Sequence, residues 1–273
     1  MAAGPDLSRH KRRTQARRLK ERGRKALRQG LTEGTDDDTL LGLGLIIHEK
    51  LADRQCAARA SEAAALAQKV LERSLVEFDA TVACQRGCAH CCHSVVSATP
   101  PEVFRIAAFL RSGQAASSEL GSQAVSARCR AKLGPSIEEM IARKRACPLL
   151  IDDACGVYRL RPLSCRQLLS RSVEMCIATM HEGKDVQPFV SSALDRGVLV
   201  RILLLGAMKA SGLADTSYEL SGALSIALAI EDAERRWLDG ENVLAIRLRY
   251  NLISADSPGN NVLLAGIEQS VRV

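Results

Sequence analysis

Four cysteines and two histidines lie within ten residues of the chain, in the stretch CQRGCAHCCH from Cys84 to His93. The cysteines follow the spacing C-x3-C-x2-C-C. Gaps of two or three residues let thiolates on one tight turn converge, and four converging sulfurs suit zinc or an iron–sulfur cluster. Cysteines that pack as small apolar core residues do not need such clustering. The stretch therefore predicts a metal site.

A second set of cysteines follows in the stretch CPLLIDDACGVYRLRPLSCRQLLSRSVEMC. It comprises Cys147, Cys155, Cys165 and Cys176. The chain has two further cysteines. We expect Cys56 to pack inside a helical core and Cys129 to be a surface thiol.

Cations and imidazoles accompany both sets. Four thiolates around a divalent ion leave a local charge of about −2, so neighbouring cations stabilise such a site. Arg86, Arg161 and Arg166 are placed for this role along the sequence. We expect His90 and His93 to be hydrogen-bonding or exposed groups, with metal ligation as the alternative.

The adjacent residues Cys91 and Cys92 bear on how many metals are held. Neighbouring side chains point to opposite sides of an extended backbone, and they also diverge on a helix. We therefore expect this pair not to meet at one mononuclear site. It predicts either a multinuclear centre or two four-sulfur sites that share both cysteine segments.

Together the two segments resemble a known family. The first cluster, the run CPLL and the pattern C-x-x-Y-x-x-R-P-x-x-C-R from Cys155 to Arg166 are similar to the YkgJ-type cysteine-cluster family, also called the zinc- or iron-chelating CxxCxxCC domain. The resemblance covers roughly residues 80–180. It implies eight metal ligands, which fall here on Cys84, Cys88, Cys91, Cys92, Cys147, Cys155, Cys165 and Cys176. A relative, flagellin lysine N-methylase, implies that such a domain can serve an enzyme that uses S-adenosylmethionine.

The spacing of Cys84, Cys88 and Cys91 is also that of the radical S-adenosylmethionine motif. That family places the motif after the first strand of a β/α barrel. Here the preceding residues predict a helix, and no alternating series of strands and helices follows. The context therefore does not favour radical chemistry of that type.

The elements around the cysteines are predicted to be helices. Aromatic residues make up 3% of the chain, which favours helices over sheets. An apolar stripe from Ala60 to Phe78 has helical spacing, Thr99 before Pro100 and Pro101 predicts a helix start, and residues 190–211 and 217–238 read as helices. Thr35 or a following Asp should cap an earlier helix. The expected fold is mainly α, a helical bundle with an irregular cysteine-rich layer.

Four segments follow from this pattern. Residues 1–34 form a basic, flexible arm that can be helical from about Arg9 to Arg28. Residues 35–79 form a long helical segment, 80–186 the cysteine-cluster domain, and 187–273 C-terminal helices that pack on it. Residues 1–30 hold 11 Lys and Arg against 2 Asp and Glu, a balance of +9, whereas the rest of the chain balances at −2. The arm makes nucleic acid a candidate partner through phosphate contacts, although it has no aromatic residue to stack on bases.

No export signal or membrane span emerges, because the longest apolar runs are short or interrupted by Arg201. We therefore expect a cytoplasmic protein in a reducing compartment, where ten cysteines indicate metal or redox chemistry rather than disulfides.

Two functions remain. In the first, the cysteines hold iron, as an iron–sulfur cluster or non-haem iron, with a redox or modification role and an unknown protein or redox partner. An iron–sulfur oxidoreductase and an S-adenosylmethionine-linked modification enzyme both fit, and no catalytic residue emerges. In the second, zinc is structural, and the helices and basic arm contact RNA or an acidic partner.

Overall fold

The computed structural model describes residues 9–114, 117–245, 265–267 and 269–271, and the chain is mainly helical there, as predicted. The longer helices are α1 (Arg9–Gln29), α2 (Asp37–Ala52), α3 (Arg59–Leu75), α4 (Pro100–Arg111), α5 (Ser122–Lys132), α9 (Ser191–Ala210) and α10 (Leu220–Ala229). The shorter ones are α6 (Ile137–Arg143), α7 (Leu163–Arg166), α8 (Val173–Met180) and α11 (Ala233–Leu238). Single 3-10 turns are η1 (Val76–Phe78), η2 (His90–His93), η3 (Ser118–Leu120) and η4 (Tyr158–Leu160).

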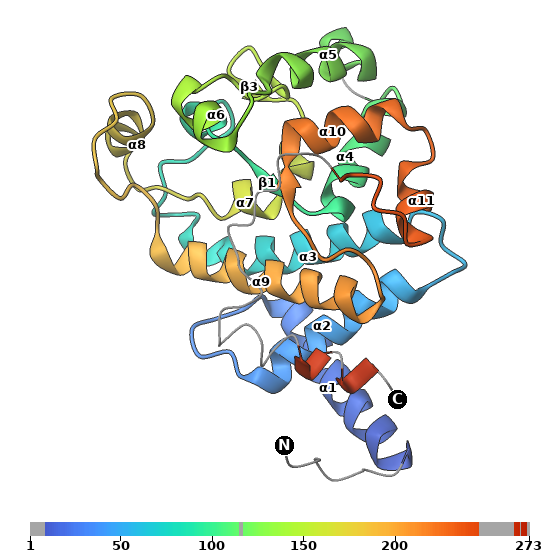
Figure 1. The fold of residues 1–273 in the computed structure, drawn as a ribbon. Helices are drawn as coiled ribbons and strands as arrows, with labels where there is room; N and C mark the ends of the chain where they lie inside the picture. The colour runs from blue at the N-terminus through green and yellow to red at the C-terminus, as the bar shows by residue number, and fades with distance from the viewer. Residues whose placement is uncertain (1–8, 115–116, 246–264, 268, 272–273) are drawn as a thin grey trace.

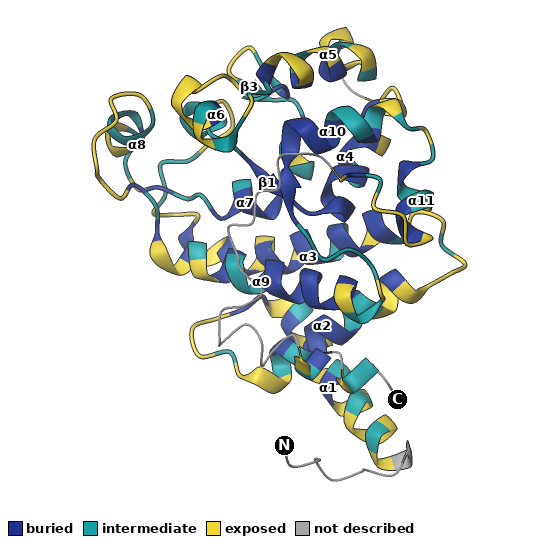
Figure 2. Cartoon of the chain, viewed as in Figure 1, coloured by how far each residue is buried: buried dark blue, intermediate teal, exposed yellow. Residues whose placement is uncertain are grey.

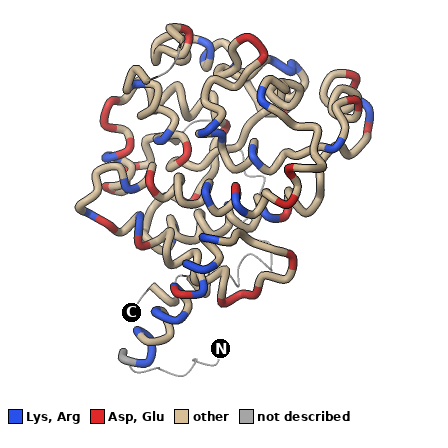
Figure 3. The backbone as a smooth tube through the Cα atoms, turned by 180° about the vertical axis from the view of Figure 1, so that it is seen from behind, with Lys and Arg blue, Asp and Glu red and all other residues tan. Residues whose placement is uncertain are grey.

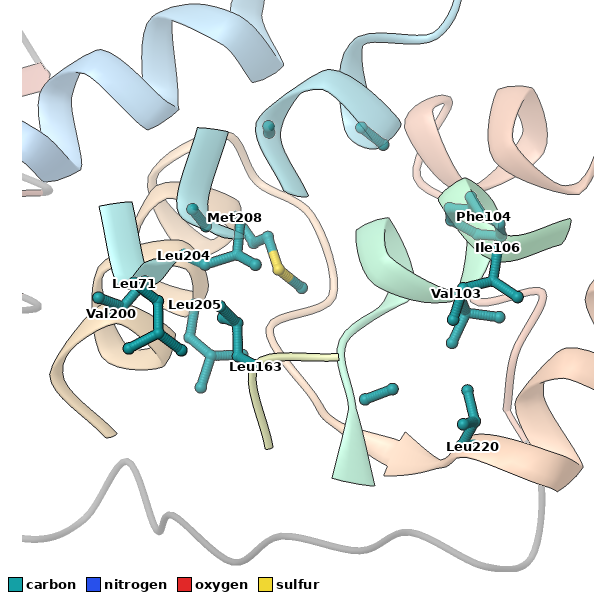
Figure 4. Close-up of a cluster of buried hydrophobic side chains, with 14 of the residues drawn as sticks. Leu71, Val103, Phe104, Ile106, Leu163, Val200, Leu204, Leu205, Met208 and Leu220 are labelled. Atoms are coloured by element: carbon teal, nitrogen blue, oxygen red, sulfur yellow. The ribbon is translucent and has the colours of Figure 1, made fainter. Parts of the chain in front are cut away.

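The helices form layers (Figure 1). Helices α3 and α9 lie across the middle of the molecule and pack on each other, with α1 and α2 on one side and α4, α7 and α10 on the other. The alanines Ala60, Ala63, Ala64 and Ala67 of α3 are fully buried, and these small side chains let neighbouring helices approach closely. Larger side chains from α3, α4, α7 and α9 fill the core between these layers (Figure 4).

The predicted segment 35–79 is two helices rather than one. Asp36 caps α2, since its carboxylate accepts a hydrogen bond from the Thr39 amide at 3.0 Å. The break between α2 and α3 comes at Asp53, whose carboxylate accepts from the Gln55 amide at 3.2 Å. A short polar side chain that bonds its own backbone in this way favours a turn over further helix.

Helix α4 starts as predicted and is fixed to the cysteine layer. Thr99 and Glu102 form a capping box. The buried Glu102 carboxylate accepts from the Thr99 amide at 2.8 Å and also from the Leu163 amide at 2.6 Å. Because Leu163 begins α7, this carboxylate holds the starts of two helices together.

Two small antiparallel sheets complete the cysteine layer. Strand β1 (Ser97–Ala98) pairs with β4 (Tyr218–Glu219), and β2 (Leu150–Ile151) pairs with β3 (Ala154–Cys155). The β2–β3 turn is formed by Asp152 and Asp153, whose φ angles are 46° and 55°. Two successive left-handed residues are typical of a tight hairpin turn, which brings Cys155 back toward Leu150.

The expected flexible arm holds a helix that packs on the body. The Leu19 and Ala26 side chains of α1 are buried, while the opposite face of the helix is exposed (Figure 2). A Cβ atom on Gly23 would lie 2.4 Å from the backbone of Gly42, so the two helices cross in direct contact at a pair of glycines. The helix matches the expected helical stretch from about Arg9 to Arg28, but its packing on the body was not expected of a flexible arm; residues 1–8 lie outside the described part.

The C-terminal helices follow the predicted positions with one further break. Residues 190–211 correspond to α9, and 217–238 contain α10 and α11. Trp237 of α11 is buried against Phe104 of α4, with ring centroids 5.6 Å apart. No helix in the described residues is long and apolar enough to cross a membrane.

Candidate metal centre

Backbone hydrogen bonds bring the two cysteine segments together. The Cys147 amide donates to the Cys92 carbonyl at 2.7 Å, and the Ala83 amide donates to the Ser170 carbonyl at 2.7 Å. The first segment runs through η2, and the second runs through the β2–β3 hairpin, α7 and α8. The cysteines that are separate in sequence therefore belong to one layer of the fold.

One group of thiols forms where the first segment meets α8. The Cys84 sulfur accepts from the Ser170 amide at 3.2 Å. Burial raises the pKa of Cys84, and the thiols of Cys88 and Cys176 raise it further. The pKa of buried Cys176 is raised mainly by desolvation and also by Cys88. Cys84, Cys88 and Cys176 thus lie close enough to influence one another.

A second group lies on the hairpin and α7. Burial raises the pKa of Cys147 to about 11, with Cys155 adding to the shift. Burial also raises the pKa of Cys165, and both Cys147 and Cys155 raise it further. These three thiols are surrounded by apolar groups, and the metal-free protein keeps them protonated at neutral pH.

Cys91 interacts with both groups, whereas Cys92 interacts with Cys91 and with the second group. The Cys91 thiol acts electrostatically on Cys84 and Cys176 of the first group and on Cys155 and Cys165 of the second. A hydrogen bond from the Cys92 thiol lowers the pKa of Cys91 to about 7, and the Arg161 charge contributes; the pKa of Cys92 is raised in turn.

The thiols of this adjacent pair thus interact with each other, and the expectation that they do not meet at one mononuclear site stays a prediction. The rule of divergence holds for the Cα–Cβ bonds of neighbouring residues, but each sulfur is one bond further out. Rotation about χ1 lets the two sulfurs of Cys91 and Cys92 approach each other.

Six of the eight candidate cysteines line one cavity of about 250 Å³. They are Cys88, Cys91, Cys92, Cys147, Cys155 and Cys165. The rest of the wall is largely apolar and includes Val96, Leu149 and Phe189. A cavity of roughly 150 Å³ already accommodates a benzene-sized ligand, so this one has room for a group of several atoms.

The donor set fits a thiophilic metal. Thiolates are soft ligands that select zinc or iron–sulfur clusters over magnesium or calcium. No group of three or more His, Cys, Asp or Glu side chains in the described residues is already arranged to hold an ion. Binding would therefore deprotonate the thiols and draw them inward, as is usual when metal binding and folding are coupled.

Residues 83–183 match the family model CxxCxxCC. The family is described as "putative zinc- or iron-chelating domain", and the match contains all eight candidate ligands. The predicted resemblance to this domain is confirmed over the matched residues, and the match supports metal binding as their general activity. Neither a curated protein nor a solved structure gives a match to the chain.

Arg161 is a cation that acts electrostatically on three thiols within the matched residues 83–183. It lowers the pKa of Cys91 and, against the larger effect of burial, also acts to lower those of Cys155 and Cys165. Its guanidinium lies 3.7 Å from the centroid of the Tyr158 ring, which fixes the side chain. The predicted role of Arg161 beside the sulfurs is consistent with this geometry.

The other two cations predicted to stabilise the thiolates, Arg166 and Arg86, lie in different surroundings from Arg161. Arg166 is 5% exposed and pairs with Glu72, and its Nε donates to the Arg161 carbonyl at 2.9 Å. It therefore shapes the loop that carries Arg161, although it also acts to lower the pKa of Cys155. Arg86 is exposed.

Lys132 is a cation that the sequence analysis did not identify. This residue of α5 is 5% exposed, and its ammonium donates to the Ser94 carbonyl at 3.0 Å. It opposes the effect of burial on the pKa of Cys147. A lysine in a basic helical stretch gives no sequence signal of this kind, because only the fold brings α5 beside η2.

His181 is the second residue that sequence reasoning missed. Its Nε2 lies 3.1 Å from Nδ1 of His90, and its ring centroid is 5.4 Å from that of His93. Three of the five histidines of the chain therefore meet at the edge of the cysteine layer. The expectation of hydrogen bonding for His90 agrees with this arrangement.

Cys129 is buried rather than on the surface. It is 0% exposed on α5, and burial raises its pKa to about 12. The expectation was wrong because the flanking Arg128 and Arg130 suggested an exposed face. The expectation that Cys56 packs inside a helical core is also wrong, because Cys56 is half-buried and lies in the turn between α2 and α3.

Proposed function

We propose that the eight cysteines hold one multinuclear iron centre, an iron–sulfur cluster or a non-haem iron site, that serves a redox or modification reaction. The position of Cys91 and Cys92 carries this proposal. The two thiols interact with each other, Cys91 also interacts with Cys84 and Cys176 of the first group, and both interact with Cys165 of the second.

The number of thiols exceeds what one structural metal ion needs. A structural zinc site is closed by four ligands in a tetrahedron. Here eight thiols belong to one layer, and six of them line one cavity of about 250 Å³. A single ion with four thiolates would leave the remaining thiols buried without use. A centre of several atoms accounts for both the number of sulfurs and the room between them.

Cations beside the cavity also favour a thiolate-bound centre. A thiolate-rich centre is strongly negative, and buried negative charge needs fixed cations nearby. Arg161 and Lys132 supply these from two different elements, and both act to lower the pKa of cavity thiols. When bound, an iron centre of this kind would supply one-electron chemistry.

Structural zinc is the alternative function, and one observation favours it. The two segments meet through a few backbone hydrogen bonds and the thiol cavity, so a metal that clamps them would stabilise the layer. Such a protein would be colourless and would lose its fold on chelation, whereas an iron–sulfur protein would absorb visible light and bleach on reduction.

The test compares one ligand from each group. Cys88→Ser and Cys165→Ser should each abolish binding of the whole centre, because both contribute to one unit. Cys56→Ser is the matched control and should keep the wild-type metal content. If each ligand variant instead lost half of the metal, two separate sites would replace the single centre. If all three retained wild-type metal, the assignment would be wrong.

A further inference from the structure

The packing of helix α1 determines which of its faces carries the positive charges. Its buried strip consists of Leu19, Gly23, Ala26 and the following Gly30. Because these residues face α2 and α3, the lysines and arginines between them must point outward. Figure 3 shows Lys and Arg repeated along this helix, at the end of the molecule opposite the cysteine layer.

The exposed cations form two rows. At about 100° per residue, Arg13, Arg17 and Arg24 fall within roughly 40° of one another around the helix axis. By the same geometry Lys11, Arg18 and Lys25 fall within roughly 40° of one another, about 120° from the first row. All six side chains are exposed. The rows therefore run along opposite flanks of the helix face that is turned to solvent.

Acidic side chains near α1 are engaged by other cations. Arg22 pairs with Asp36 at 2.7 Å, and Lys20 pairs with Glu49 at 2.5 Å. These ion pairs tie α1 to α2 and to the turn before it. Glu21 is the one acidic residue within Arg9–Gln29 itself. The two rows thus keep a strong positive field.

We propose that α1 binds the phosphate backbone of duplex DNA, lying in the major groove with one cationic row toward each strand. An α-helix with its side chains is about 10–12 Å wide, which matches a major groove of about 12 Å. Duplex RNA has a deep, narrow major groove that excludes a helix. Residues 9–29 contain no aromatic side chain to stack on single-stranded bases.

Binding of this kind is independent of sequence and falls with salt. Each phosphate contact releases counterions, so log Kd changes with log salt by about 0.9 per contact. Six cations therefore predict a slope of up to about 5. Because α1 lies opposite the cysteine layer, DNA binding does not depend on the metal centre, and either proposal can fail without the other.

The test measures fluorescence anisotropy of a labelled 20-base-pair DNA duplex between 50 and 300 mM salt. Two triple variants of the intact chain each remove one row, Arg13→Gln with Arg17→Gln and Arg24→Gln, or Lys11→Gln with Arg18→Gln and Lys25→Gln. Each should weaken binding at least tenfold at 100 mM salt and reduce the slope by about 2.7. The matched control replaces the exposed cations Lys69, Arg130 and Arg171 by glutamine and should bind like the wild type.

Circular dichroism and metal content should be the same for all four proteins, which separates lost binding from lost folding. Row variants that bind DNA as tightly as the control would overturn the proposal. Tighter binding of wild-type protein to a duplex RNA, or to vesicles with anionic lipids, than to DNA at equal salt would also overturn it.

Discussion

The backbone amide of Cys147 donates a 2.7 Å hydrogen bond to the carbonyl oxygen of Cys92. This contact joins the start of the second cysteine segment to the end of the first one. It holds the backbones of two residues whose thiols line the same cavity next to each other. Preorganisation of this kind lowers the entropy cost of bringing ligands from two segments to one centre.

Arg161→Gln should weaken metal retention while leaving the fold intact. The guanidinium stabilises thiolates at Cys91, Cys155 and Cys165, and glutamine keeps polarity without charge. The measurement is the rate of metal loss to an excess of chelator at pH 7.5, which should rise several-fold. Arg159→Gln is the control two residues away, since Arg159 is exposed. Equal rates for both variants would show that Arg161 has no electrostatic role.

Glu102→Ala should destabilise the protein by about 2–4 kcal/mol, because it leaves buried amides at Thr99 and Leu163 without their acceptor. The measurement is the free energy of unfolding in urea. Glu33→Ala removes an exposed carboxylate and should change stability by less than about 0.5 kcal/mol. A similar small change for both would contradict the role of Glu102 as a link between α4 and α7.

Gly42→Ala should separate α1 from α2 and cost about 3 kcal/mol, because the new Cβ would lie 1.9 Å from the Leu19 carbonyl oxygen. Gly44→Ala is the control on the same helix. Its Cβ would meet side chains rather than backbone, Ile267 at 2.6 Å and Leu203 at 3.7 Å, and these side chains can move. The measurement is hydrogen exchange of the α1 amides, which should be faster in Gly42→Ala than in Gly44→Ala. Protection of α1 that survives in Gly42→Ala would refute the close crossing.

Cys129 should resist alkylation by iodoacetamide at pH 8 in the folded protein. With a pKa of about 12, its thiolate fraction there is about 10⁻⁴, compared with roughly a quarter for an ordinary thiol. Half-buried Cys56 is the internal reference, and mass spectrometry gives both rates. Labelling of Cys129 at the rate of Cys56 would contradict its burial.

The raised pKa of Cys129 determines whether the protein becomes more or less stable as pH rises. Unfolding returns the pKa of Cys129 from about 12 toward the ordinary thiol value of 9.0, so between these values the folded state binds more protons. The free energy of unfolding should therefore fall as pH rises from 9 to 12. Cys129→Val removes this contribution, and its stability should fall less over that interval.

The sequence predicted well those elements that local signals define. The capping box at Thr99 and Glu102, the alanine face of α3 and the long helix α9 all follow from spacing and caps. The eight-cysteine ligand set is implied by the resemblance to the CxxCxxCC domain and stays a prediction, whereas these helical features follow from the sequence alone. These features need no knowledge of what packs against them.

Other features depend on contacts between distant segments. The buried face of α1 is built on glycine, alanine and a single leucine, so it has little apolar signal before α2 covers it. Lys132 and His181 reach the cysteine layer only through the placement of α5 and α8. The approach of Cys91 and Cys92 depends on side-chain rotamers, which a rule about Cβ directions does not include.

Analysis of iron and acid-labile sulfide, on protein purified without air, tests the multinuclear iron centre most directly. The account predicts more than one iron per chain and a visible absorption that is lost on reduction; matching sulfide would make the centre an iron–sulfur cluster, and its absence a non-haem iron site. One or two zinc ions per chain, with neither iron nor sulfide, would contradict it and make the cysteine layer a structural clamp.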